Sequence, residues 1–145
     1  MSKAIRPEQT INGSFGELWV AGDLIGSCTG FQANIEIEYE DINTPRKLGK
    51  GRKMIGWEGK GEIKINKVIL RFITILSDNL KAGKQTTVLI ISKLDDPDAL
   101  GAERVVIKDA TFDSMMLAGW ESKKVIEETI PFAFSDWELL DFIEG

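Results

Sequence analysis

Apolar and polar residues alternate in two stretches of the chain. In residues 31–42, FQANIEIEYEDI, the side chains of Ile35, Ile37 and Tyr39 fall on one side of an extended strand. Residues 57–65, WEGKGEIKI, alternate in the same way. A period of two residues predicts strands with one apolar face and one wet face. The wet faces hold Glu36, Glu38 and Glu40 in the first stretch, and Glu58, Lys60, Glu62 and Lys64 in the second.

We expect these two strands to pair antiparallel. The pairing would bring the three glutamates of the first strand alongside Lys60 and Lys64 of the second. Opposite charges across a strand pair stabilise it by roughly 0.2 to 1 kcal/mol each.

The period changes after residue 66 and predicts a helix. Its apolar stripe consists of Ile69, Phe72, Ile73, Leu76 and Leu80. Asn66 can cap the start of this helix and Gly83 can close its end.

The remaining apolar segments predict further strands. Residues 16–30 predict a hairpin with a turn at 21–24, and residues 85–94 predict a strand that is covered on both faces, one of them by the helix. Residues 104–116 and 123–134 predict two more strands around a turn near 118–122. We therefore predict a mainly β fold with one helix, in a single domain over residues 1–145.

One predicted strand contains a proline. In ETIPFAFSDWELL, residues 128–140, the side chains of Ile130, Phe132 and Phe134 share one face, and Pro131 interrupts the backbone between them. Proline cannot donate to a ladder and is found mainly at sheet edges or bulges. We therefore expect this strand at a rim that something else covers.

The charge of the chain is unevenly distributed. Residues 46–60 hold six basic residues and one acidic residue, so this segment is +5 and the remainder of the −5 chain is −10. Such an asymmetry indicates contact with nucleic acid or attraction between copies of one molecule. A solvated mobile loop is a third interpretation of the basic segment.

The composition excludes several kinds of chemistry. The chain has no histidine and one cysteine, Cys28, so neither a Ser/His or Cys/His nucleophile nor an internal disulfide can form. Asp95, Asp96 and Asp98 lack EF-hand spacing and are expected to form an acidic turn. We predict no catalytic residues, no cofactor and no metal site, and hence no enzyme.

Nothing in the sequence predicts a membrane protein. The apolar runs are shorter than the eighteen or so residues that span a bilayer, and the opening residues MSKAIRPEQT lack the apolar stretch of a signal peptide. We expect synthesis in the cytoplasm. The four tryptophans are expected to be core or interface anchors, namely Trp19, Trp57, Trp120 and Trp137.

Four segments in order resemble the tail tube (core tail) proteins of contractile phages and phage-like particles of Gram-positive bacteria. They are INGSFGELWVAGDLI, FQANIEIEYEDI, WEGKGEIKINKVILRF and ERVVIKDATFDSMMLAGWESKKVIEETIPFAFSDWELL, of which RVVIKDATFDS and IPFAFSDW are the most specific. The resemblance implies a β-sandwich or barrel with one flanking helix, similar to the tube protein of type VI secretion. It also implies hexameric rings that stack into a hollow conduit for DNA or effectors.

The resemblance also implies partners and contact surfaces. The partners are other copies, the tail sheath, baseplate and tail-terminator proteins, and a tape-measure protein in the lumen, with DNA passing unbound and no membrane contact. A basic loop at about 43–58 would contact the next subunit or ring through Arg46, Lys47, Lys50, Arg52, Lys53 and Trp57.

Two further surfaces follow by position. The wet faces would line the channel with Glu36, Glu38, Glu40, Glu58, Lys60, Glu62 and Lys64, a charge of −3 per copy from five acidic and two basic residues. Ile130, Pro131, Phe132 and Phe134 would form an edge-strand interface. The alternative function is a small β-barrel module that binds nucleic acid through the basic loop 46–60.

Overall fold

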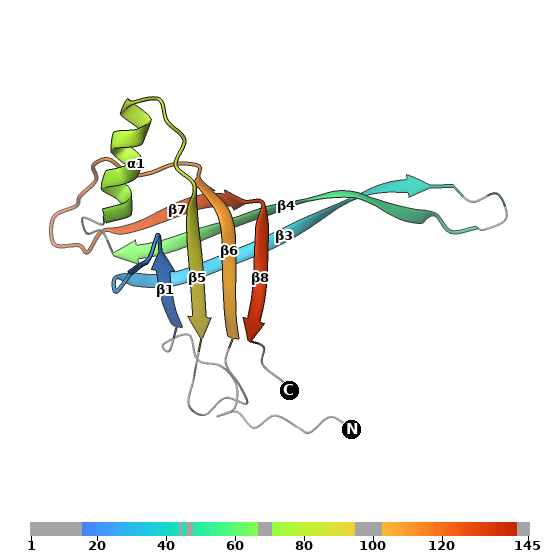
Figure 1. Ribbon diagram of the computed structural model, residues 1–145, viewed down its shortest axis with the longest axis horizontal. Coiled ribbons are helices and arrows are strands. Elements are labelled where there is room, and N and C mark those ends of the chain that lie inside the picture. The colour runs from blue at the N-terminus through green and yellow to red at the C-terminus, as the bar shows by residue number, and fades with distance from the viewer. Residues whose placement is uncertain (1–15, 44, 46–47, 67–70, 95–102, 142–145) are drawn as a thin grey trace, which may run out of the picture.

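The computed structural model describes residues 16–43, 45, 48–66, 71–94 and 103–141 (Figure 1). Its elements are β1 (Gly16–Val20), β2 (Asp23–Leu24), β3 (Cys28–Ile42), β4 (Gly51–Asn66), α1 (Arg71–Lys81), β5 (Val88–Leu94), β6 (Glu103–Phe112), β7 (Glu127–Phe134) and β8 (Asp136–Asp141). The predicted mainly β fold with one helix is confirmed for the described part of the chain. β8 was not predicted.

The strands form two layers that share β6. All the pairings are antiparallel, in the order β2-β1-β5-β6-β7-β4-β3, with β8 beside β6. In Figure 1, β1, β5, β6 and β8 run across β3, β4 and β7. β6 pairs with β5 and β8 through its first part, and then with β7 at Thr111 and Phe112.

A bulge bends β6 from one layer into the other. The register with β5 shifts between Val88 and Ile90, and Asp109, inside the bulged stretch of β6, has a positive φ of 54°. Asp tolerates this region better than most residues. The hydroxyl of Ser135, between β7 and β8, donates to the Asp109 carboxylate at 3.2 Å and joins the two layers at this corner.

The core lies between the two layers. β1, β5 and β6 contribute Leu18, Val20, Ile90 and Ile107, and β4 and β7 contribute Ile63, Ile65, Ile130 and Phe132. In β4 and β7 the alternate residues face away from this core, as a strand period of two requires. The wet face of this layer is therefore fixed by the packing of its core face.

The helix ends as the sequence predicts. Gly83 has a φ of 72°, its N–H donates to the carbonyl of Leu80 at 3.1 Å, and the N–H of Lys84 donates to the carbonyl of Asn79 at 2.8 Å. This is a Schellman motif, in which glycine takes the left-handed position at no steric cost. Asn66, the predicted cap, is instead the last residue of β4, opposite Glu127. Residues 67–70 and part of the apolar stripe lie outside the described residues. Leu76 is buried, but Leu80 is exposed instead of packed.

Three other local predictions have different outcomes. The first hairpin is confirmed: Val20 pairs with Asp23 around a two-residue turn at Ala21 and Gly22, both with positive φ. β5 is not covered on both faces, because Leu89 is 45% exposed. The strand expected to reach residue 116 ends at Phe112, and residues 113–126 form a long β6–β7 loop.

The β3–β4 hairpin projects far from the two layers (Figure 1). We call its projecting part, residues 35–43 and 48–57, the arm. The segment predicted as a loop at 43–58 is shorter than expected, because β4 already begins at Gly51 and pairs with β3 from there. The glycines and lysines of residues 50–56 suggested a loop, but cross-strand pairing overrides their low strand propensity.

Candidate assembly surfaces

One face of the arm is apolar and exposed. Three successive cross-strand pairs carry it, namely Ile35 with Gly59, Ile37 with Trp57 and Tyr39 with Met54. The larger side chains of these pairs are 37% to 60% exposed. Cross-strand pairs stabilise a sheet most when their side chains are covered. The described chain covers only Trp57 among them, through Trp137 and Phe134, so the rest of the face is available to another molecule.

The basic residues of the arm lie opposite acidic residues of the same hairpin. Arg52 pairs with Asp41, and Lys53 pairs with Glu40. The guanidinium of Arg52 also lies 3.8 Å from the ring centroid of Tyr39, a cation–π contact. Two of the basic residues therefore have acidic residues of the same copy as cross-strand neighbours. A free basic patch, which the nucleic-acid alternative needs, is smaller here than the sequence indicates.

The predicted charge pairing between β3 and β4 is wrong in register, although the two strands do pair antiparallel. Lys60 lies opposite Asn34, Lys64 lies opposite Gly30, and Glu36 lies opposite Glu58. The register is set by the core pattern and by two irregularities in the ladder, not by surface charge. The lysines instead pair along their own strand, Lys60 with Glu58 at 3.3 Å and Lys64 with Glu62 at 4.0 Å.

Trp57 lies at the base of the arm, not at its tip. Its ring centroid is 5.0 Å from that of Trp137 in an edge-on arrangement, and 6.4 Å from that of Phe134. Both partners belong to the same copy. The prediction that Trp57 belongs to the contact loop is therefore corrected: much of its ring surface fixes the arm to the body of its own subunit, which a sequence pattern could not reveal.

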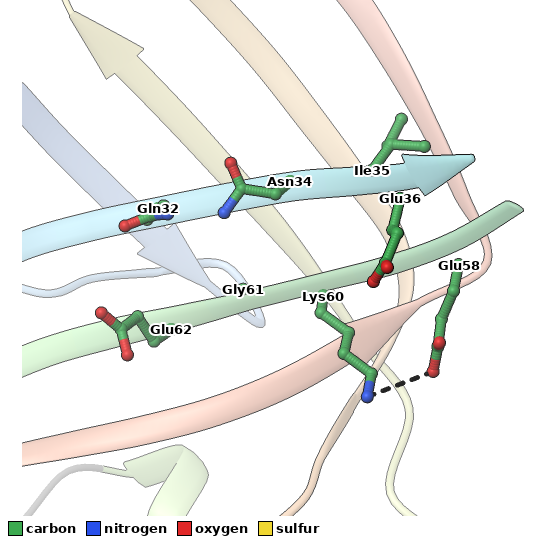
Figure 2. A pocket seen from close by; sticks show the side chains of 8 residues that line it. All are labelled: Gln32, Asn34, Ile35, Glu36, Glu58, Lys60, Gly61 and Glu62. Carbon is green, nitrogen blue, oxygen red and sulfur yellow. Dashed lines mark ion pairs between the residues drawn. The ribbon is translucent and has the colours of Figure 1, made fainter. Parts of the chain in front are cut away.

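The wet face of the β3–β4–β7 layer carries the predicted channel residues. Figure 2 shows Glu36, Glu58 and Lys60 on one side of the hairpin, with Ile35 on the other. By register, Gln32 and Asn34 extend this face along β3, and Glu127 and Thr129 extend it onto β7. Sequence reasoning missed these four residues, although the same alternation runs through them.

The charge of the wet face stays at −3. The seven predicted residues contribute −3, Lys53 opposite Glu40 adds +1, and Glu127 opposite Asn66 adds −1. Most of these side chains are exposed, so each ion pair along the face contributes little to stability. The face nevertheless presents a regular array of carboxylates and ammonium groups to whatever lies above it.

Pro131 lies in a strand that is fully paired on one side and paired over only two residues on the other. β7 pairs with β4 along its whole length but with β6 only at Phe132 and Ala133. The carbonyl of Pro131 accepts the N–H of Asp113 at 2.9 Å. Because the N and O atoms of one strand residue point to the same side, the missing N–H faces the place where the β6 ladder ends.

The apolar side chains beside Pro131 are core residues of their own copy. Ile130 and Phe132 are fully buried, Phe134 is nearly so, and the Phe132 ring stacks on Phe31 at a centroid distance of 5.8 Å. The expectation that these side chains form an edge-strand interface is therefore corrected. β7 itself lies between β4 and β6 and not at an end of the strand order, so the expected rim position is corrected as well. What stays a prediction is that the backbone edge of this layer, on β3, meets another copy.

Some predicted residues lie outside the described part of the chain. These are Arg46 and Lys47 of the basic segment, and Asp95, Asp96 and Asp98. Within the described ranges, no group of three or more acidic or cysteine side chains is placed to hold a metal ion. No helix among the described residues has the length and apolarity needed to cross a membrane.

These features describe a two-layer β subunit with a projecting hairpin, and the described residues leave most of the apolar face of that hairpin uncovered. Comparison with known families identifies the subunit more specifically. The chain belongs to the family described as phage tail tube protein, whose model matches residues 3–141. The protein is therefore a structural component of the tail tube of a phage or phage-like particle.

Two proteins of Bacillus subtilis (strain 168) are similar to this chain over nearly its whole length. The chain is 30% identical over 138 residues to the phage-like element PBSX protein XkdM, and 31% identical over 138 residues to the uncharacterized protein YqbM. Each match covers 94% of this chain and 94% of the relative.

Solved structures share the fold. A chain of the PVC sheath–tube complex of an extracellular contractile injection system, in the extended state, superposes with a TM-score of 0.72 at 7% identity. The match covers 95% of both chains. At this identity the likeness is one of fold.

Proposed function

We propose that copies of this chain form hexameric rings that stack into the inner tube of a contractile tail, and that the arm makes the contact between rings. The observation that carries the proposal is the row of exposed apolar side chains on the arm, which are Ile35, Ile37, Tyr39 and Met54. An apolar face on a projecting hairpin is costly in water unless a partner covers it.

The partner in this proposal is another copy. Each ring interface is heterologous, because an arm on one copy fits a different surface on the next. β3 also supports this arrangement: it is fifteen residues long and ends the order of described strands, so its outer edge can continue the sheet into a neighbour.

In this proposal, apolar contact provides the affinity and charge provides the register. Arg52 and Lys53 already face acidic residues of their own hairpin, which leaves less charge for docking than the sequence predicts. The exposed Lys50 would guide the orientation of the next copy. A charge reversal at Arg52 or Lys53 would also disturb the arm itself. Replacing an apolar residue of the arm is therefore the cleaner test.

The wet face of the β3–β4–β7 layer would line the channel. With −3 per copy and many copies around the axis, the wall repels a polyanion, so that DNA or an acidic effector slides without binding. The function requires geometry and passive electrostatics and no chemical step. The sheath would cover the outside of the tube, baseplate and terminator proteins its two ends, and a tape-measure protein its lumen.

The test compares two substitutions of equal exposure. Ile37, on the arm, and Leu89, on β5, are both 45% exposed. We expect Ile37→Ser to fold normally but to reduce the yield of sedimentable tubes by about tenfold or more, since burying such a side chain contributes about 1.5–3 kcal/mol. Leu89→Ser should assemble normally. Normal tubes from Ile37→Ser would refute the role of the arm.

A further inference from the structure

A second exposed apolar surface lies on the β6–β7 loop, residues 113–126. Leu117, Trp120 and Val125 are 80% to 85% exposed, more than any arm residue in the cross-strand pairs. Trp120 was expected to be an anchor in a core or interface, and the described chain gives it no core. Large side chains this exposed and this close in sequence mark an interaction site.

The loop is held in shape by a buried carboxylate. Glu128, at the start of β7, is only 3% exposed, and its Oε1 accepts the N–H of Met116 at 2.8 Å. A buried carboxylate is costly unless it is hydrogen-bonded, so its role here is structural. The loop also packs on itself, because a Cβ at Gly119 would lie 2.8 Å from the sulfur of Met116.

The far end of the loop is likewise fixed. Lys123 adopts a φ of 62°, the N–H of Lys124 donates to the carbonyl of Glu121 at 3.2 Å, and the two side chains form an ion pair at 3.3 Å. The loop therefore presents its apolar residues from a defined turn and does not depend on a partner to create it. A preorganised surface of this kind binds with a smaller loss of conformational entropy.

The loop and the arm lie at opposite ends of the molecule. In Figure 1 the loop curves around the end that carries α1, and the arm projects from the other end. Two different apolar surfaces at opposite ends form a heterologous contact that repeats from copy to copy. A self-complementary dimer would instead need the same surface on both partners.

We infer that the β6–β7 loop is the receptor for the arm, so that the apolar face of an arm in one ring packs on Leu117 and Trp120 of a copy in the next. This inference rests on the proposed tube. Each copy has one arm and one loop, which gives one receptor per arm throughout a stack. The exposed carboxylate of Asp113, the first residue of the loop, suits the basic residues of the arm.

The experiment uses cysteine cross-linking in a Cys28→Ser background. One protein carries Met54→Cys on the arm, and the other carries Leu117→Cys on the loop. When the two are mixed, assembled and mildly oxidised, we expect a disulfide-linked dimer that neither protein forms alone. A mixture of Met54→Cys with Leu89→Cys is the matched control and should give no such dimer.

A second variant provides an independent readout. Trp120→Ser should keep its fold, measured by circular dichroism and thermal unfolding, but should reduce tube yield by about tenfold, as expected for a central aromatic anchor. If tubes form and the Met54–Leu117 dimer is absent, or if Trp120→Ser tubes are normal, the receptor is elsewhere although the tube proposal stands. If the wild-type protein forms no tubes, the tube proposal itself fails.

Discussion

Gly61 is the position where a single methyl group should do the most harm to the fold. It lies opposite Phe132 in the β4–β7 pairing, and a Cβ there would collide with the Phe132 ring and with the backbone carbonyl oxygen of Gln32. The Phe132 ring is fully buried and stacked on Phe31, so it cannot rotate away. The carbonyl belongs to the β3–β4 hairpin and is equally fixed.

The expected cost of Gly61→Ala follows from two opposing effects. Overpacking against fixed atoms lowers the free energy of unfolding by about 2–3 kcal/mol. Alanine also restricts the unfolded chain more than glycine does, which raises the free energy of unfolding by about 0.5–1 kcal/mol. The net destabilisation is about 1–2.5 kcal/mol. For a chain of this length it corresponds to a fall in Tm of about 3–8 °C.

Gly56→Ala is the matched control. Gly56 lies in the same strand, but its added Cβ would meet only Glu38 Oε2 at an ordinary 3.6 Å. We expect this variant to be as stable as the wild type or up to about 1 kcal/mol more stable. Both variants should be unfolded at low protein concentration, because assembly raises apparent stability. Equal stability of the two variants would refute the packing argument.

Four further outcomes follow from single contacts. Glu128→Ala should lower the free energy of unfolding by about 1–3 kcal/mol and Glu128→Gln by less, since only the amide keeps an acceptor for the loop. Asp109→Val should cost about 1–2 kcal/mol more than Asp109→Asn, because a β-branched residue resists a positive φ; equal costs would contradict the bulge assignment. A double-mutant cycle between Trp57 and Trp137 should give a coupling of about 0.5–1.5 kcal/mol, and no coupling would exclude the edge-on contact. Burial raises the pKa of the Cys28 thiol, so near pH 8 the folded protein should react with a thiol reagent more slowly than the urea-unfolded chain; equal rates would contradict this burial.

The sequence predicts the strands best where a repeating pattern crosses many residues. The alternation at 31–42 and 57–65 and the left-handed glycine at the helix end are local signals, and the structure confirms the elements they predict. The wet face of β4 follows from the same alternation. The proline at 131 predicts a strand at a rim, whereas β7 lies between β4 and β6 and is unpaired only where the β6 ladder ends.

Other features depend on partners that are distant in sequence. The register that places Glu36 opposite Glu58 depends on the packing of the core and on the position of a bulge, neither of which surface charge controls. The role of Trp57 at the base of the arm depends on Trp137, and β6 changes layers at one left-handed residue, Asp109. Such tertiary contacts leave no periodic signal in one sequence.

Electron cryomicroscopy of the concentrated protein would show whether the chain forms a tube and where the arm lies in it. We expect hollow tubes of stacked rings in which the side chains of Ile37 and Met54 are buried against a copy in the next ring. We also expect Glu36 and Lys60 to face the bore. Particles that stay monomeric at every concentration, or tubes in which the apolar face of the arm remains exposed to solvent, would contradict this expectation.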